Sequence, residues 1–114
     1  MAIRTKRIYE PFSPEDGRRY LIDRLWPRGV SKDTAHVNEW LRDLAPSAEL
    51  REWFSHKIER YPEFRKRYRD ELQAKPALIA RVREEGRKGT VTLLYAAKDA
   101  EHCNASVLRE LLEG

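Results

Sequence analysis

The sequence predicts an α/β protein of three layers, with a mainly parallel sheet of about four strands and helices on both faces. The stretch TVTLLYAA, residues 90–97, is apolar on both faces and rich in β-branched residues, which is typical of a central parallel strand. Amphipathic helical patterns separate the predicted strands, and this alternation indicates a parallel sheet. The 114 residues suffice for one domain with its own core, so 1–114 is treated as a single α/β domain.

The N-terminal part is predicted to supply two strands. The segment Ile3–Ile8 alternates in polarity and indicates a short edge strand. Ser13, Pro14 and Glu15 favour one helical turn, which Gly17 would end. The segment Tyr20–Leu25 has apolar residues on both faces and predicts a second, covered strand.

The following segment is harder to interpret. Ser31 is a plausible N-cap, so a short helix is predicted over Ser31–Ala35. The apolar residues of 37–44 have helical spacing, but the segment is short and Ala45 precedes a proline, which disfavours helix there. We interpret Glu39–Asp43 as a third strand.

Four positions mark where longer helices begin. Ser47 is predicted to cap one helix, Pro62 opens the next, Pro76 opens a third that ends by Gly86 or Gly89, and Asn104 caps the last. The residues predicted to face inward are Leu50, Trp53, Phe54, Lys57, Ile58, Tyr61, Phe64, Tyr68, Leu72, Leu78, Ile79, Val82, Val107, Leu108, Leu111 and Leu112.

Composition narrows the class of protein. Cys103 is the single cysteine, so no internal disulfide is possible and a reducing compartment is favoured. No apolar run approaches the ~20 residues of a membrane span, and the N-terminus lacks the apolar segment of a signal peptide. We therefore expect a cytoplasmic protein with no membrane partner. The net charge of +4 is compatible with an anionic ligand, with nucleic acid, or with ordinary solvent-exposed helices.

A candidate site lies where two predicted strands end. Parallel sheets bind ligands beyond the carboxyl ends of their strands, and 23–29 and 98–104 occupy such positions. Asp23 and Arg24 are consecutive in the predicted strand and point to opposite faces, so each needs a partner. Asp23 either projects into a pocket and meets Arg28 or Lys98, or forms a structural ion pair that anchors a loop.

The segment Trp26-Pro27-Arg28-Gly29 predicts a rigid turn. Proline fixes its φ angle and glycine permits a positive one, so Arg28 would be held ready to grip a carboxylate or phosphate. Trp26 would stack on a ring of the ligand; the alternative is a turn whose tryptophan covers the core.

The opposite wall is predicted from the last strand. Lys98 and Asp99 follow that strand directly, and the free N–H groups at Asn104 favour an anion. The alternative is a simple helix cap, with Asp99 bonding the loop backbone.

Other candidates carry weaker signals. The residues CNASVLR fit the Cys-x5-Arg spacing of cysteine phosphatases, but they read as the start of a helix, which argues against catalysis by Cys103. The three histidines are scattered, so neither a metal nor another cofactor is predicted. The run RKRYR, residues 65–69, is either a nucleic-acid contact or the solvent-exposed face of a helix.

The combination of DRLWPRG, LAPS and TLLYAAKD resembles the YeaO-like proteins of the DUF-488 family, over about residues 3–112. The resemblance implies a single-domain α/β protein, usually cytoplasmic, and no established reaction. Longer members of the family resemble this chain with a Cys-His-Arg triplet where it has Cys103-Asn104-Ala105. The absence of that histidine and arginine argues further against chemistry at the cysteine.

We expect a small anionic ligand, phosphate- or nucleotide-like, at the carboxyl ends of the strands. Arg28 would clamp the anion, and Asp23 would orient Arg28 or act as a general base in hydrolysis or group transfer. The other expected ligand-binding residues are Arg24, Trp26, Lys98, Asp99 and Asn104. The alternatives are a nucleic-acid-binding or regulatory module without catalysis, and a structural domain in which DRLWPRG is only an ion-paired turn.

Overall fold

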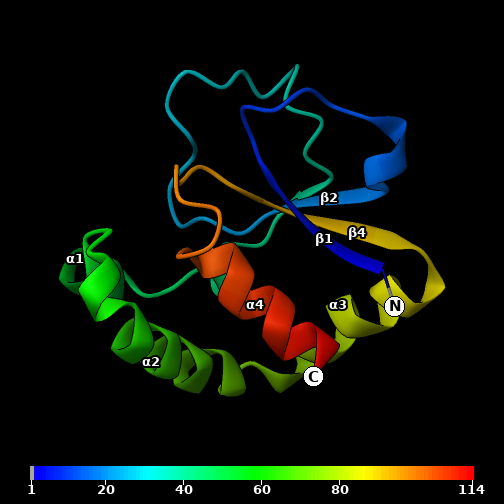
Figure 1. Ribbon diagram of the computed structural model, residues 1–114. Coiled ribbons are helices and arrows are strands. Elements are labelled where there is room, and N and C mark those ends of the chain that lie inside the picture. Colours follow the sequence, from blue (N-terminus) through cyan, green and yellow to red (C-terminus); the bar gives the residue numbers. More distant parts are fainter. Residues whose placement is uncertain (1) are drawn as a thin grey trace.

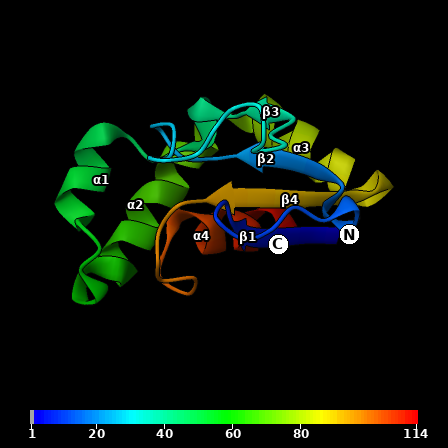
Figure 2. The same cartoon turned by 90° about the horizontal axis from the view of Figure 1, so that it is seen from above.

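A four-stranded, fully parallel sheet forms the centre of the structure, a computed structural model that describes residues 2–114. Its strands lie in the order β1-β4-β2-β3, as Figure 2 shows. They are β1 (Ala2–Arg7), β4 (Thr90–Tyr95), β2 (Arg18–Leu21) and β3 (Glu39–Trp40). The central position of β4 and the edge position of β1 are confirmed, and so are the α/β class and the parallel sheet.

Four α-helices follow the predicted pattern. They are α1 (Ala48–Phe54), α2 (Tyr61–Gln73), α3 (Pro76–Lys88) and α4 (Asn104–Glu113); a 3-10 turn, η3 (Ile58–Arg60), joins α1 to α2. Ser47 caps α1 by accepting a hydrogen bond from the Leu50 N–H, as predicted. Phe64, Tyr68 and Leu72 of α2 are buried, which confirms that stripe. Because α1 ends at Phe54, Lys57 and Ile58 are exposed, and their predicted inward position is wrong.

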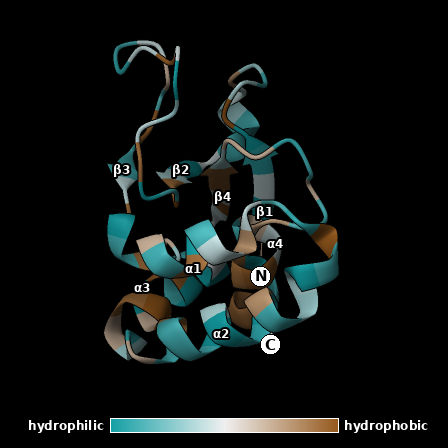
Figure 3. Cartoon of the chain, turned by 90° about the vertical axis from the view of Figure 1, so that its left-hand side faces the viewer, coloured by the Kyte–Doolittle hydropathy of each residue, from teal (hydrophilic) through white to brown (hydrophobic). Residues whose placement is uncertain are grey.

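The helices do not divide between the two faces of the sheet. All four α-helices pack on one face, in one core with Val91, Leu93 and Tyr95 of β4. Figures 1 and 3 show them on the same side of the strands. The third layer is present, but it consists of the 3-10 turn η1 (Pro14–Asp16) and the loop 22–38, whose Trp26, Val30 and Val37 cover Leu21 and Leu94. The prediction of helices on both faces is corrected in this respect.

Two predicted strands are shorter than expected. β2 ends at Leu21; the Ile22 N–H still bonds the Leu94 carbonyl at 3.1 Å, and the chain then leaves the sheet. Asp23 and Arg24 are therefore outside the strand. β3 is limited to Glu39–Trp40, since a 3-10 turn, η2 (Arg42–Leu44), follows it. This turn packs Leu44 into the helix-side core, and the chain pairs no further with β2.

The predicted helix at Ser31–Ala35 is a turn. The Ser31 hydroxyl accepts a hydrogen bond from the Asp33 N–H and its carbonyl accepts one from Thr34, but the pattern stops there. The chain instead extends so that the carbonyls of Ala35 and His36 reach the guanidinium of Arg19. Tertiary hydrogen bonds thus override the local capping preference.

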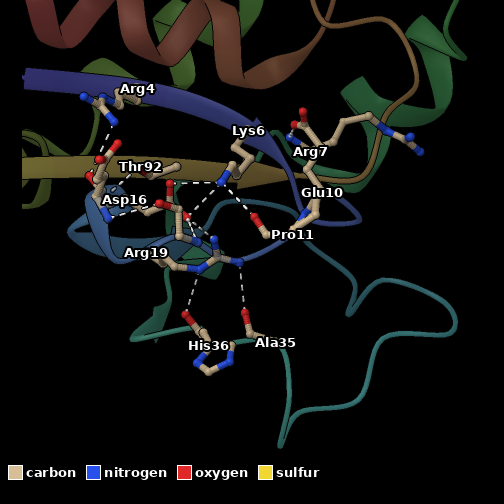
Figure 4. Close-up of polar contacts among 12 residues, drawn as sticks. Arg4, Lys6, Arg7, Glu10, Pro11, Asp16, Arg19, Ala35, His36 and Thr92 are labelled. Carbon is tan, nitrogen blue, oxygen red and sulfur yellow. Dashed lines mark hydrogen bonds and ion pairs between the residues drawn. The ribbon is translucent and has the colours of Figure 1, made fainter.

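A buried ionic cluster holds the non-helical face together (Figure 4). Asp16 is 5% exposed and accepts hydrogen bonds from Lys6 of β1 at 3.0 Å and from Arg19 of β2 at 2.5 Å. Its backbone carbonyl accepts a bond from the Thr92 hydroxyl of β4 at 2.6 Å. Burial by itself raises the pKa of Asp16, but the bonds from Lys6, the Ser13 N–H and Arg19 outweigh it and lower the pKa. The cluster ties η1 to three strands.

Gly17 lets η1 lie this close to the sheet. Its φ angle is +65°, a conformation that other residues rarely adopt, and a Cβ atom there would lie 2.2 Å from the Thr90 carbonyl oxygen. The predicted end of the helical turn at Gly17 is confirmed, and its cause is this contact with β4.

We predict that Asp16→Asn lowers the free energy of unfolding by about 3–5 kcal/mol, because it leaves the buried charge of Arg19 without its carboxylate. Urea denaturation measures the change. The control is Glu63→Gln, which removes an exposed i,i+4 pair with Arg67 and should cost less than about 1 kcal/mol. Equal losses in the two variants would contradict a stabilising role for the cluster.

Candidate functional site

A pocket opens where β2 and β4, which are neighbours, both end. After β2 the chain crosses the non-helical face, whereas after β4 it turns to the helical face and enters α4. Such divergence leaves a crevice at the carboxyl edge of a parallel sheet. The cavity there has a volume of about 690 Å³ and is lined by both loops and by α1, which lies beyond the strand ends in Figure 2. The prediction that the two loops face each other is confirmed.

Asp23 is the polar centre of this pocket. One carboxylate oxygen accepts a hydrogen bond from the Asn104 amide at 3.0 Å, and the other accepts one from the Ala96 N–H at 2.9 Å. The carboxylate therefore joins the end of β2 to the end of β4 and the start of α4. Burial raises the pKa of Asp23, and these two donors offset part of that rise. Its expected partner, Arg28 or Lys98, is replaced by Asn104.

The DRLWPRG turn lines one wall. Gly29 has a φ of +78°, as a tight turn requires, and the exposed Arg28 is anchored through its carbonyl, which accepts a bond from Tyr9 at 2.9 Å. Arg24 donates from Nε to the Pro46 carbonyl at 3.0 Å. Its partner is thus a backbone carbonyl, and neither Arg24 nor Arg28 bonds Asp23.

Trp26 both packs on the non-helical face and lines the pocket. Its indole N–H donates to the Val30 carbonyl at 2.7 Å, and its ring meets the edge of Trp40 with centroids 5.5 Å apart. It belongs to the cluster on the non-helical face and also lines the pocket. The covering role is therefore present, and stacking on a ligand stays a prediction.

The loop after β4 supplies the opposite wall. Lys98 is exposed at its start. Asp99 accepts bonds from the N–H groups of His102 and Glu101, and from the His102 ring at 2.9 Å. The bond from the His102 N–H, followed by those from the ring and from Glu101, lowers the pKa of Asp99. Asp99 thus organises its own loop, which is the simpler of the two predicted roles.

Asn104 is the first residue of α4, and Cys103 occupies the cap position without a side-chain cap bond. The predicted cap at Asn104 is therefore wrong, because its amide is used elsewhere: it donates to both the Ile22 carbonyl and Asp23 at 3.0 Å. Cys103 is buried, and burial raises the pKa of its thiol. A neutral thiol is a poor nucleophile, in agreement with the sequence argument.

Two side chains of the pocket, Arg51 and His56, were not predicted as site residues from the sequence. Arg51 lies on α1, and His56 follows two residues after α1 ends. Ser55 and His56 both adopt left-handed backbone angles, with φ of 48° and 56°. No glycine marks this turn, and only the placement of α1 beyond the strand ends brings Arg51 near Asp23. No sequence pattern predicts that either residue lines the pocket.

The pocket carries an excess of positive charge. Arg24, Arg28, Arg51 and Lys98 line it, and none of the four forms an ion pair within residues 2–114. The two carboxylates that line it, Asp23 and Asp99, are occupied by the hydrogen bonds described above. Over the same range, no three His, Cys, Asp or Glu side chains are grouped to hold a metal ion.

A family model described as the inactive DUF488-N3 subclade matches residues 2–114. The chain belongs to this subclade. The uncharacterized protein Rv3073c of Mycobacterium tuberculosis (H37Rv) is 44% identical over 98% of this chain and 94% of its own length, and Mb3100c of Mycobacterium bovis matches equally. The uncharacterized protein YeaO of Escherichia coli K12 is 39% identical over 98% of this chain and 97% of its own length. No solved structure matches.

The family assignment confirms the resemblance to YeaO-like proteins. The word "inactive" belongs to the description of the subclade. None of the helices within residues 2–114 is both long and apolar enough to cross a bilayer.

We predict that Asn104→Ala raises the pKa of Asp23 further, because it removes a donor that favours the ionised carboxylate. An NMR titration of the Asp23 side-chain carbonyl carbon measures this. The raised pKa also makes stability depend on pH. Because the folded protein holds the proton on Asp23 more tightly than the unfolded chain does, the contribution of Asp23 to the free energy of unfolding falls as the pH rises through that pKa. An unchanged midpoint in the variant would show that the bond from Asn104 does not stabilise the charge.

Proposed function

We propose that the pocket binds a small molecule through an anionic group, a phosphate or a carboxylate. The observation that carries the proposal is the set of four basic side chains around one cavity, none of them ion-paired within the described chain. A volume of about 690 Å³ lies within the range of roughly 300–1,000 Å³ typical of small-molecule sites.

Arg28 is the main anion clamp in this proposal. It is exposed at the pocket, its turn is fixed by Pro27 and Gly29, and a guanidinium can give two parallel hydrogen bonds to a carboxylate or phosphate. Arg51 lines the same cavity from α1, and Lys98 adds charge from the loop after β4. Three separate elements would thus close around one anion.

Asp23 has a positioning role in the proposal. Each of its oxygens already accepts a hydrogen bond, and these bonds hold the two walls of the pocket together. Hydrolysis or group transfer with Asp23 as general base stays a prediction. It requires that Asp23→Asn lose turnover while it keeps its fold, and turnover equal to wild type would contradict the base role.

The nucleic-acid alternative has less support. Two of the arginines in the RKRYR run are neutralised, since Arg65 pairs with Glu110 at 2.6 Å and Arg67 with Glu63 at 2.8 Å. The helix α2 therefore presents mixed charge to solvent, and this favours the solvent-exposed interpretation of the run.

We predict that the double variant Arg28→Ala/Arg51→Ala weakens binding of ribose 5-phosphate by about tenfold or more, because each charge-assisted hydrogen bond contributes about 1.5–3 kcal/mol. Isothermal titration calorimetry at low salt measures the affinity. Arg87→Ala is the matched control, because it removes an arginine near the end of α3 that pairs with Glu84 and does not line the pocket. Equal affinity in the two variants would contradict the assignment of the site.

Short duplex DNA tests the alternative in the same assay. If the pocket proposal is right, DNA binds weakly and salt abolishes this binding. The Arg28→Ala/Arg51→Ala variant should then affect DNA binding no more than the Arg87→Ala control does. If DNA binding depends on Arg65 or Arg69 and ribose 5-phosphate does not bind, the binding site is the surface of α2 and not the pocket.

A further inference from the structure

The floor of the pocket presents hydrogen-bond acceptors. Both N–H bonds of the Asn104 amide are used, on the Ile22 carbonyl and on Asp23, so the amide oxygen points away from them. That oxygen accepts no hydrogen bond within residues 2–114. Because no fully buried side-chain polar atom there lacks a partner, solvent must reach the Asn104 oxygen, and Asn104 lines the pocket.

Asp23 offers further acceptor capacity beside it. A carboxylate has about four lone-pair sites, and hydrogen bonds from Asn104 and Ala96 use one on each oxygen. The floor therefore combines a carboxylate and an amide oxygen, separated by one hydrogen bond. Both groups complement a ligand that carries N–H donors.

The walls beside these acceptors are apolar and aromatic. Phe54 and Phe64 are 5% and 2% exposed, and their rings are stacked with centroids 4.3 Å apart. Both line the pocket, and Pro46 and Trp26 extend the same kind of surface. A flat ring fits such walls, because it buries apolar faces and directs its polar edge to the acceptors.

The cations lie nearer to solvent than the acceptors. Arg28, Arg51 and Lys98 are exposed, whereas Asp23 and Asn104 are half-buried. A ligand that satisfies both regions has a donor-bearing ring at one end and an anion at the other. Inorganic phosphate or a sugar phosphate would leave the acceptors of the floor empty.

We propose that the ligand is a nucleotide whose base presents adjacent N–H donors, as guanine does, with the base edge on Asp23 and Asn104 and the phosphate at Arg28 and Arg51. This inference rests on the proposed anion-binding function and adds the identity of the ring. Guanine offers a ring N–H beside an amino group, hypoxanthine keeps only the ring N–H, and adenine has an acceptor nitrogen in place of the ring N–H.

The test is calorimetric titration of the wild-type protein with GMP, IMP, AMP and ribose 5-phosphate under one buffer condition. We expect affinity to fall in that order, with GMP bound about tenfold or more tightly than AMP, because a buried acceptor left unpaired is costly. AMP or ribose 5-phosphate binding as tightly as GMP would overturn the base recognition and leave the anion site intact. Binding of none of the four compounds would overturn the anion site as well.

Asp23→Asn provides a second measurement. Replacing one acceptor oxygen by an amino group should weaken GMP about tenfold or more and leave ribose 5-phosphate unchanged. Asp70→Asn, an exposed site on α2 outside the pocket, is the matched control. Equal loss for GMP and ribose 5-phosphate would mean that Asp23 acts through the shape of the pocket, which contradicts its contact with the base. If the variant does not fold, the wild-type series decides.

Discussion

The parallel pairing of β2 with β4 is the constraint on which both the core and the pocket depend. It places Tyr20 beside Leu93 and Leu21 beside Leu94, so segments some seventy residues apart along the chain end at the same edge of the sheet. The chain then leaves β2 toward one face and β4 toward the other. Without this pairing, Asp23 would not meet Ala96 or Asn104, and the crevice between the two loops would not exist.

Two carboxylates flank β2 and show how differently the fold uses buried charge. Asp16 precedes the strand and is bonded by two cations, and its pKa is lowered. Asp23 follows the strand and is bonded only by neutral donors, and its pKa is raised. Asp16 forms internal ion pairs, and its charge is neutralised by the adjacent Lys6 and Arg19. Asp23 forms no direct ion pair within residues 2–114 and lies at the edge of a cavity, which is the arrangement expected of a group that meets a ligand.

The sequence predicts those features that depend on local pattern. The apolar run of β4, the cap at Ser47, the stripe of α2 and the end of η1 at Gly17 each follow from residues close together in the chain. The strand end at Leu21, the turn at Ser31 and the position of Asn104 could not be predicted. Each involves hydrogen bonds to a distant segment: Asp23 bonds Ala96 and Asn104, and the Ala35 carbonyl bonds Arg19. Arg51 and His56 entered the site by the same route, through the placement of α1.

The strand order also determines how the sheet ends. One edge is β3, only two residues long, which offers little backbone for another chain to pair with. The other edge is β1, which carries the charged residues Arg4, Lys6 and Arg7; Lys6 points inward over the sheet to Asp16. Short edge strands and charged edge residues are the means by which soluble sheets resist edge-to-edge aggregation. Both edge strands therefore offer little for a further strand to pair with, and the sheet ends at four members.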